Sequence, residues 1–340
     1  AGLAALFAYG PPEASPLGLD DLRWGFLALA LASALVDVVL GGLRFQIFIR
    51  RAHPRSPLSL PIRADLAGRF VGAVTPSQTG GGPAQVFVLH RGGVPVPEAL
   101  SLLLVNLIST LLFVFVAGGF SAWLLQDRFG KGALRGLMQY GFAVIGVLLA
   151  LMVTALVRPD VAARPFAWLA RCAARDGRRL GLLGRAAAVL VESLEQYRVA
   201  CRRFVRQDPW LPLASFGLTI LIYLNKFAVA WLVMRGLGVE RDFVVTVALL
   251  ALVHLSVFLA PSPGGSGIAE VATGAFVSIL LPGALVGPFT LVYRSLIVYG
   301  PAAAGAFFLL GALKGQRAAP HGGTAARGVS PLPRRSSTAT

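Results

Sequence analysis

The chain of 340 residues is 56% hydrophobic and 14% charged, and its formal net charge is +16 at pH 7. A soluble domain carries roughly 25% charged residues, so this composition excludes an ordinary water-soluble fold and indicates an integral membrane protein. An excess of basic residues is typical of cytoplasmic loops between apolar spans, and we therefore expect no nucleic-acid partner.

Residues 1–21 begin with a short apolar run and continue with Pro11 and Pro12. The run is too short to cross a bilayer, which takes about 20 apolar residues, and it lacks the basic flank of a signal peptide. We interpret 1–21 as an outer segment or as the remnant of a helix that starts before Ala1.

Five apolar segments have the length of a membrane-spanning helix, namely 22–48, 98–124, 136–157, 210–234 and 288–312. Two further apolar stretches, 64–92 and 243–282, are interrupted by Pro and Gly residues, which break helices. The predicted fold class is an all-α integral membrane protein with two broken or re-entrant helical hairpins.

The broken stretches lie in two membrane halves. The first half, 22–157, contains the hairpin 64–92, whose first arm is too short to cross alone and is expected to return to its own side. The second half, 210–312, contains the hairpin 243–282, whose longer arms either cross twice or re-enter. In both cases the two ends of a hairpin emerge on one side of the membrane.

The segment 158–209 separates the halves and carries 11 arginines against five acids. This bias places it in the cytoplasm, where it forms either amphipathic helices on the inner membrane surface or a solvated connector. Its cysteines, Cys172 and Cys201, are expected to be reduced thiols. Residues 313–340 are rich in Gly, Ala, Ser, Pro and Arg and are predicted to be a disordered tail.

Basic residues also orient the spans. The loop after the first span, to which we assign five arginines, is expected in the cytoplasm: Arg44, Arg50, Arg51, Arg55 and Arg63. With both interruptions treated as hairpins, this loop, the segment between the halves and the tail all face inward. The basic residues of a predicted outer loop run against this pattern: Arg128, Lys131 and Arg135. The expected location is a bacterial cytoplasmic (inner) membrane, crossed several times.

Each hairpin is centred on a copy of one decapeptide, at 76–85 and 261–270. The identical pairs are Pro76/Pro261, Ser77/Ser262, Gly80/Gly265, Gly82/Gly267 and Ala84/Ala269, and Gln85 aligns with Glu270. The predicted orientation makes the repeat inverted, and paired breaks of this kind indicate the substrate site of a transporter. The alternative is that the glycines only let the hairpin arms pack closely.

Ionisable residues inside spans are costly unless they face a cavity or a partner, so they are candidates for a binding site. Glu270, at the start of a helical arm, and Arg294, beside Tyr293 in the last span, form one candidate pair, whose alternative role is structural. Lys226 lies in the middle of the fourth span, and Arg69 enters the first hairpin. Arg69, Lys226 and Arg294 together suit a phosphate headgroup, because Arg presents a bidentate fork.

Other polar residues in the spans have structural roles available. Asp65 and Arg69 are spaced to bridge on one helix face, and Asp37 and Asn106 are candidates for interhelical hydrogen bonds. His254 is expected to be a hydrogen-bonded core residue rather than a proton carrier. The candidate substrate-binding residues are Arg69, Ser77, Gly80, Gly81, Gly82, Gln85, Lys226, Ser262, Gly264, Gly265, Gly267, Glu270, Tyr293 and Arg294.

The sequence contains no motif of nucleophilic or ATP-dependent catalysis and no His/Cys spacing typical of a metal site. We therefore expect neither an enzymatic activity nor a cofactor or metal.

Several segments resemble one family when they are taken together. They are Gly68-Arg69-Phe70, Thr75-Pro76-Ser77, Thr79–Gln85, Val94 with Glu98-Ala99, Pro261–Gly267 with Glu270, and Tyr293-Arg294. They are similar to the lysylphosphatidylglycerol synthase transmembrane, or flippase-like, family over residues 22–312. That family includes the membrane half of the multiple peptide resistance factor, which moves aminoacylated phosphatidylglycerol between leaflets. It also includes stand-alone proteins, some of them linked to polyprenyl-phosphate sugar pathways.

The resemblance implies a lipid site around the two motifs, with Glu270 and Arg294. Only a short tail follows Leu313, with no aminoacyl-transferase domain, so synthesis of lysyl-lipid is not expected. The expected function is to translocate or bind a phospholipid (aminoacyl-phosphatidylglycerol-like) or a polyprenyl-phosphate lipid. The expected partners are membrane lipids, either an anionic phospholipid or a polyprenyl phosphate. The alternatives are a non-transporting scaffold that presents lipid to a partner synthase or glycosyltransferase, and a permease for small solutes or ions. A homo-oligomer is compatible with each of these.

Overall fold

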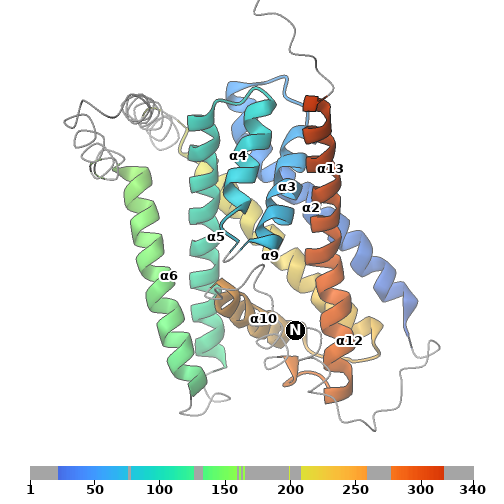
Figure 1. Ribbon diagram of the computed structural model, residues 1–340. Helices are drawn as coiled ribbons and strands as arrows, with labels where there is room; N and C mark the ends of the chain where they lie inside the picture. Colours follow the sequence, from blue (N-terminus) through green and yellow to red (C-terminus); the bar gives the residue numbers. More distant parts are fainter. Residues whose placement is uncertain are drawn as a thin grey trace, which may run out of the picture.

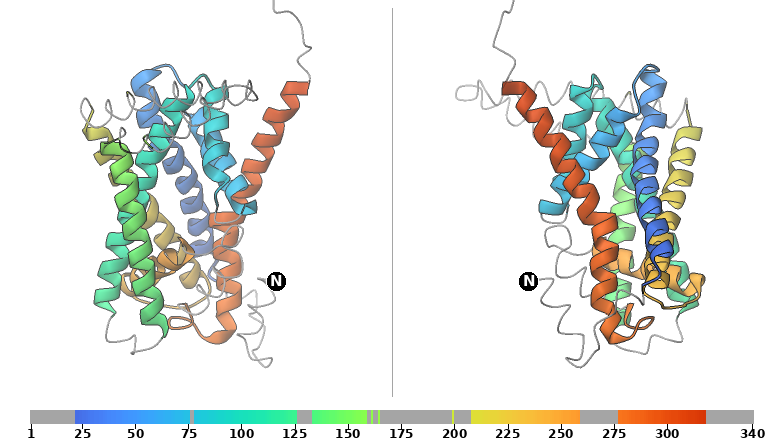
Figure 2. Two further views of the ribbon diagram at one scale, coloured as in Figure 1. Left: turned by 60° about the vertical axis from the view of Figure 1, so that its left-hand side comes forward. Right: turned by 90° about the vertical axis from the view of Figure 1, so that its right-hand side faces the viewer.

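The computed structural model describes residues 22–75, 78–125, 133–158, 208–258 and 277–317, with the single residues 161, 164 and 199. Every element in these ranges is a helix, which confirms the all-α prediction (Figures 1 and 2). The elements are α2 (Trp24–Ala52), α3 (Ser59–Val74), α4 (Gly81–Arg91), α5 (Val96–Leu124), α6 (Ala133–Val157), α9 (Trp210–Gly236), α10 (Phe243–Phe258), α12 (Gly283–Arg294), the π-helix η4 (Ser295–Tyr299) and α13 (Gly300–Arg317).

Five helical stretches are long and apolar enough to cross a membrane, as the sequence predicts. They are Trp24–Arg51, Val96–Leu124, Gln139–Val157, Trp210–Gly236 and Gly283–Gly311. The last stretch runs through α12, η4 and α13 and begins at Gly283 rather than at residue 288. Pro288 lies inside α12, where it removes an internal hydrogen bond and its ring crowds the carbonyl four residues earlier.

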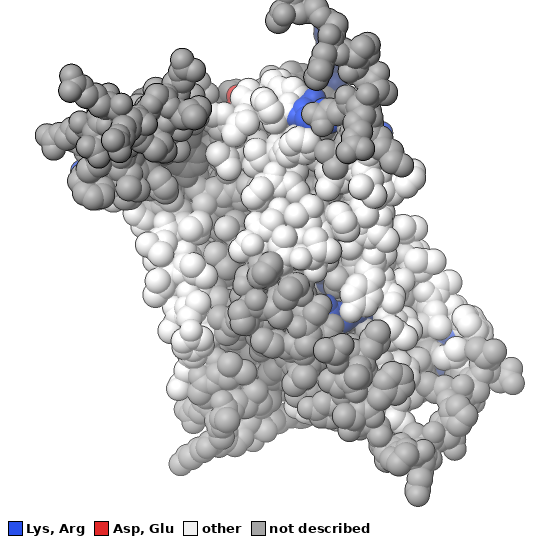
Figure 3. Space-filling model, viewed as in Figure 1, with Lys and Arg blue, Asp and Glu red and all other residues white. Residues whose placement is uncertain are grey.

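Large apolar side chains cover the outside of these helices. Leu151 on α6 is 57% exposed, Leu213 on α9 72% and Phe307 on α13 75%. Contiguous apolar surface of this kind is rare on soluble monomers, whereas lipid tails accept it. The described part of the face in Figure 3 is almost free of charge, with basic atoms at mid-height and near the upper end. The surface is that of a protein embedded in lipid.

The helices α3 and α4 form a hairpin whose turn lies near the mid-height of the bundle (Figure 1). With 16 residues, α3 is about 24 Å long, which is shorter than the roughly 30 Å hydrocarbon core. Thr75 holds the turn, because its hydroxyl accepts a hydrogen bond from the Gly80 amide at 3.0 Å and donates to the Val71 carbonyl at 2.8 Å. The hairpin starts at Ser59 rather than at residue 64, since Pro61 fits the first turn of a helix.

The helix α10 lies in the half of the bundle opposite to the α3–α4 hairpin (Figure 1). The first helices of the two predicted halves, α2 and α9, pack along each other. Residues 259–276, which hold the turn of the second predicted hairpin, lie outside the described residues. The inverted repeat therefore stays a prediction.

Parts of the predicted loop after the first span and of the predicted tail 313–340 are helical. Arg44, Arg50 and Arg51 belong to α2, which runs on to Ala52, and Arg63 belongs to α3. Of the five arginines assigned to the loop, Arg55 lies in it. At the other end of the chain, α13 reaches Arg317, inside the segment predicted as a disordered tail. The last turn of α2 holds Arg50 and Arg51, and basic side chains in a last turn interact favourably with the helix dipole.

Glycines bring the helices around α3 into backbone contact. A Cβ at Gly42 on α2 would overlap the Ile62 side chain, and a Cβ at Gly305 on α13 would overlap the Leu66 carbonyl. Small residues at such crossings are typical of helix packing in membranes. The close approach fixes α3 between α2 and α13.

We predict that Gly305→Ala destabilises the protein. The added methyl group would meet backbone atoms of α3, which cannot rotate away, so the cost is about 1–3 kcal/mol of unfolding free energy. Thermal unfolding in detergent measures it. Gly311→Ala, on the same helix, is the control, because nothing lies within 4 Å of a Cβ there. Equal midpoints for the two variants would contradict the contact.

Candidate functional site

Arg69 on α3 joins two carboxylates from different helices. Its Nη1 lies 2.5 Å from Oδ2 of Asp37 on α2, and its Nε lies 2.8 Å from Oδ2 of Asp65, one turn earlier on α3. Asp37 is 1% exposed and Asp65 6%. The predicted Asp65–Arg69 bridge is confirmed, and the contact with Asp37 turns it into a link between two helices.

Gly41 makes room for this ion pair. A Cβ at this position would lie 2.5 Å from Oδ2 of Asp65 and 3.0 Å from Nη2 of Arg69. A larger residue would push α3 away from α2 and separate Arg69 from Asp37. The charges therefore meet because a small residue stands opposite them.

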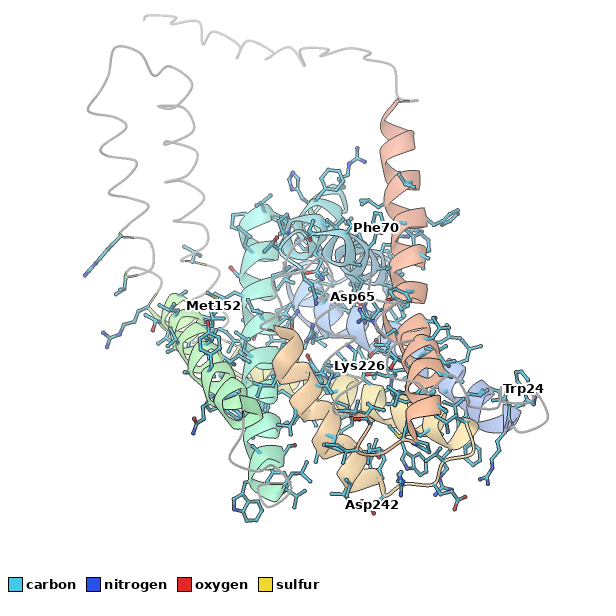
Figure 4. The ribbon with its side chains drawn as sticks, turned by 60° about the horizontal axis from the view of Figure 1, so that its bottom comes forward. Trp24, Asp65, Phe70, Met152, Lys226 and Asp242 are labelled. Carbon is cyan, nitrogen blue, oxygen red and sulfur yellow. The ribbon has the colours of Figure 1, made fainter. Side chains whose placement is uncertain are left out.

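Lys226 on α9 is the second cation of this region. Its Nζ lies 5.3 Å from the centre of the Tyr223 ring, and its charge interacts with Asp37 and Asp65 and with the cations Arg69 and Arg44. Among the described residues, no carboxylate lies within ion-pair distance of this Nζ. Figure 4 shows Asp65 and Lys226 in the interior, on α3 and α9.

Arg44 is a third cation, which the sequence interpretation misplaced. Its Nη1 donates to the hydroxyls of Thr110 on α5, at 3.1 Å, and Thr219 on α9, at 3.3 Å. Its charge interacts with Asp65, Arg69 and Asp37. The spacing of Asp37 and Arg44, seven residues apart on α2, puts both on one helix face and is the signal that could have found it.

We call Asp37, Arg44, Asp65, Arg69 and Lys226 the ionic cluster. It draws its charges from α2, α3 and α9 and combines three cations with two carboxylates. Charges at membrane depth are costly without compensation, and this set carries one positive charge in excess. The arrangement favours the binding of an anion.

Arg294 and Tyr293 stand at the edge of the cluster. Tyr293 is 6% exposed, its hydroxyl has no hydrogen-bond partner among the described residues, and it interacts electrostatically with Asp37. Arg294 is also 6% exposed and lies over the Tyr299 ring, 5.5 Å from its centre. The π-helix η4 follows Arg294 directly, and such irregular turns occur frequently at functional sites.

The structure thus brings two of the three predicted phosphate-binding cations together. Arg69 and Lys226 both act on Asp37, and Arg294 acts on Tyr293, which in turn interacts with Asp37. The remaining predicted residues of the second motif and one of the first lie outside the described residues: Ser77, Ser262, Gly264, Gly265, Gly267 and Glu270.

The described glycines of the first motif pack the hairpin. A Cβ at Gly81 would lie 3.0 Å from the Gly68 carbonyl oxygen, and one at Gly80 would lie 2.7 Å from Thr75 Cγ2. Gln85 occupies the space over Gly68, where a Cβ would lie 2.5 Å from its Nε2. These contacts fit the close-packing interpretation. Gly82 has an ordinary contact, with a Cβ 3.7 Å from Leu103.

The other polar residues of the spans have structural partners. His254 Nδ1 donates a hydrogen bond of 2.9 Å to the Leu250 carbonyl, and the ring lies edge-on to the Tyr223 ring. Asn106 on α5 accepts a hydrogen bond from Ser215 on α9 at 2.7 Å. Both predictions, of a core histidine and of an interhelical asparagine, agree with these contacts. No group of three or more His, Cys, Asp or Glu that could hold a metal occurs in the described ranges.

We predict that Asp37→Asn lowers the free energy of unfolding by about 3 kcal/mol, because it leaves Arg69 with one of its two buried counter-charges. Chemical or thermal unfolding in detergent measures the change. The double variant Asp37→Asn/Arg69→Gln should lose less than the sum of its single changes, because both changes break the same ion pair.

The matched control for this change is Glu240→Gln. Glu240 pairs with Arg23 at 3.0 Å where both side chains are about half exposed. The hydrogen bond from Arg23 and the charge of Arg235 hold the pKa of Glu240 below its usual value, but water screens such a pair. A loss of stability in Glu240→Gln as large as in Asp37→Asn would contradict the special role of the buried pair.

Known proteins related to this chain are membrane proteins. A UPF0104 membrane protein of Archaeoglobus fulgidus is 23% identical over 315 residues, which cover 87% of this chain and 91% of that protein. A UPF0104 membrane protein of Methanothermobacter thermautotrophicus is 35% identical over 94 residues, which cover 27% of this chain and 28% of that protein. No solved structure matches the chain. Both relatives are archaeal, so a bacterial inner membrane stays a prediction.

A model of the family described as the lysylphosphatidylglycerol synthase TM region matches residues 3–305. The match includes both interrupted stretches and all the apolar spans, except for the end of the last span. From the extent of this match, together with the apolar helices, the chain belongs to the lysylphosphatidylglycerol synthase transmembrane family.

Proposed function

We propose that this membrane protein binds a lipid with an anionic phosphate headgroup at the ionic cluster and moves it between the leaflets. The positive excess of the cluster carries the proposal: Arg44, Arg69 and Lys226 face only Asp37 and Asp65 in the part of the chain that the structure describes. A phosphate diester supplies a negative charge where a lone buried cation is costly. Phosphatidylglycerol-type lipids carry such a diester, and polyprenyl phosphates carry a phosphate monoester, which is also anionic.

The position of the cluster suits a headgroup that passes through the membrane. Arg69 lies in the second half of α3, whose end at the hairpin turn is near mid-height (Figure 1). Broken backbone is tolerated at that depth where it is buried in protein or lines a cavity. The side chain of Arg69 is 18% exposed and Lys226 is only partly buried, which leaves both within reach of a ligand.

The two cations have different tasks in this proposal. Arg69 is held by two carboxylates and fixes the geometry of the cluster. Lys226 forms no ion pair with a described carboxylate, so it contacts the phosphate. Arg294 and the predicted Glu270 complete the site, with Glu270 contacting a cationic headgroup or carrying a coupling proton. The family description, which names lysylphosphatidylglycerol synthase, supports a headgroup of this kind.

Liposomes with headgroup-labelled phosphatidylglycerol test the proposal. The wild-type protein is expected to expose more than the outer-leaflet half of the label to a membrane-impermeant quencher. Lys226→Gln should slow this exposure by roughly 10–100-fold, the worth of one charged hydrogen bond. It leaves Asp37 and Asp65 paired with Arg69, so the thermal midpoint should change little.

Arg50→Gln is the control. Arg50 is exposed at the end of α2, and its replacement removes the same charge as Lys226→Gln does. Lipid movement at the wild-type rate in Lys226→Gln would contradict the cluster as the site. Quenching that stops at one leaflet with folded wild-type protein would contradict translocation, and retained lipid in that case would favour a scaffold that presents lipid to a partner enzyme.

A further inference from the structure

A groove of about 660 Å³ opens between α3, α4 and α13. Arg63 and Arg91 stand in its wall among apolar side chains, and none of the described residues that line it is acidic. The apolar part of the lining includes Leu60, Ala67, Phe87, Val88, Phe307 and Phe308. The groove therefore offers two positive charges and an apolar surface to one ligand.

The groove is separate from the ionic cluster. Leu60, Arg63 and Ala67 recur at helical spacing on the face of α3 that lines the groove. Asp65 and Arg69 lie on the face of α3 that meets α2. Because α3 stands between the two, a ligand in the groove does not reach Asp37 or Lys226.

Aromatic rings hold both arginines in place. The Arg63 guanidinium carbon lies 5.7 Å from the centre of the Phe308 ring, and that of Arg91 lies 5.4 Å from the Phe87 ring. A guanidinium over a ring keeps its N–H donors in its own plane, where a phosphate can accept from them. Each cation thus carries an apolar ring beside it, which suits a ligand with a charged head and an apolar chain.

Both arginines stand at the basic end of the bundle. Arg63 lies in the second turn of α3 and Arg91 is the last residue of α4, and Arg50 and Arg51 close α2 at the same end. Figure 3 shows basic atoms near that upper end, beside α13. An end of this kind faces the cytoplasm by the positive-inside rule, where anionic lipids attract basic residues.

We infer that the groove binds an anionic glycerophospholipid of the cytoplasmic leaflet. The phosphate lies between Arg63 and Arg91, and an acyl chain follows Phe87 and Phe307 toward the middle of the membrane. Phe307 is 75% exposed, and the acyl chain would cover it. The lipid stays bound on the lipid-facing surface of the helices. Its binding does not depend on whether the ionic cluster moves lipids.

Native mass spectrometry of the protein released from nanodiscs with equal amounts of phosphatidylglycerol and phosphatidylcholine tests this site. The wild type is expected to retain phosphatidylglycerol in excess. Arg63→Gln/Arg91→Gln should reduce that excess by roughly fivefold for each arginine. Arg50→Gln/Arg55→Gln, which removes two exposed arginines from the same end but outside the groove, should keep it.

A second variant changes the space without changing the charge. Gly311 lines the groove, and nothing lies within 4 Å of a Cβ there, so Gly311→Trp fills the groove without disturbing the helix. It should lose the retained lipid and keep the thermal midpoint of the wild type.

Three results would overturn the site. The first is equal retention of the two lipids by the wild type. The second is an equal excess of phosphatidylglycerol in Arg63→Gln/Arg91→Gln and Arg50→Gln/Arg55→Gln. The third is a wild-type dimer that Gly311→Trp dissociates, because the groove would then hold a second copy of the chain. Lys226→Gln should leave the lipid excess unchanged, which separates this site from the proposed transport site.

Discussion

The double ion pair of Arg69 is the interaction on which the arrangement of the other helices depends. A lone arginine at this depth is costly, so α3 is stable inside the bundle only where Asp37 of α2 meets it, and Gly41 leaves the space for that contact. Once α3 is fixed against α2, its other faces receive α4 at Gly68 and α13 at Gly305. One electrostatic contact thus determines where the hairpin and the last span pack.

This contact also separates structure from function within the ionic cluster. The carboxylates of Asp37 and Asp65 are engaged by Arg69, so they do not pair directly with Lys226. The hydroxyls of Thr110 and Thr219 hold Arg44 without supplying charge. Arg44 and Lys226 therefore share the excess positive charge, and the flexible stem and compact ammonium of the lysine adapt to a ligand better than a locked guanidinium does.

The spans could be predicted from the sequence because length and hydropathy alone decide them. The Asp65–Arg69 bridge was predictable too, since helix geometry sets its spacing. The contact between Asp37 and Arg69 was not, because it depends on how α2 packs on α3. Arg50 and Arg51 were assigned to a loop because hydropathy shows where an apolar core ends, whereas α2 continues past residue 48 to Ala52. Arg44 was grouped with them as a basic residue although it lies inside the predicted span 22–48. The inverted repeat and the second motif lie outside the described residues.

The two cationic sites on α3 differ because their surroundings differ. Arg63 lies at the end of the bundle, where water and headgroups solvate a guanidinium, so the groove needs no acidic residue. Arg69 lies deeper, where only carboxylates replace that solvation, and two are present. Lys226 lies in the deep region without a described carboxylate in contact. Its charge, like that of Arg44, has no described carboxylate in ion-pair contact, which is the physical reason to place the proposed anion beside these two cations.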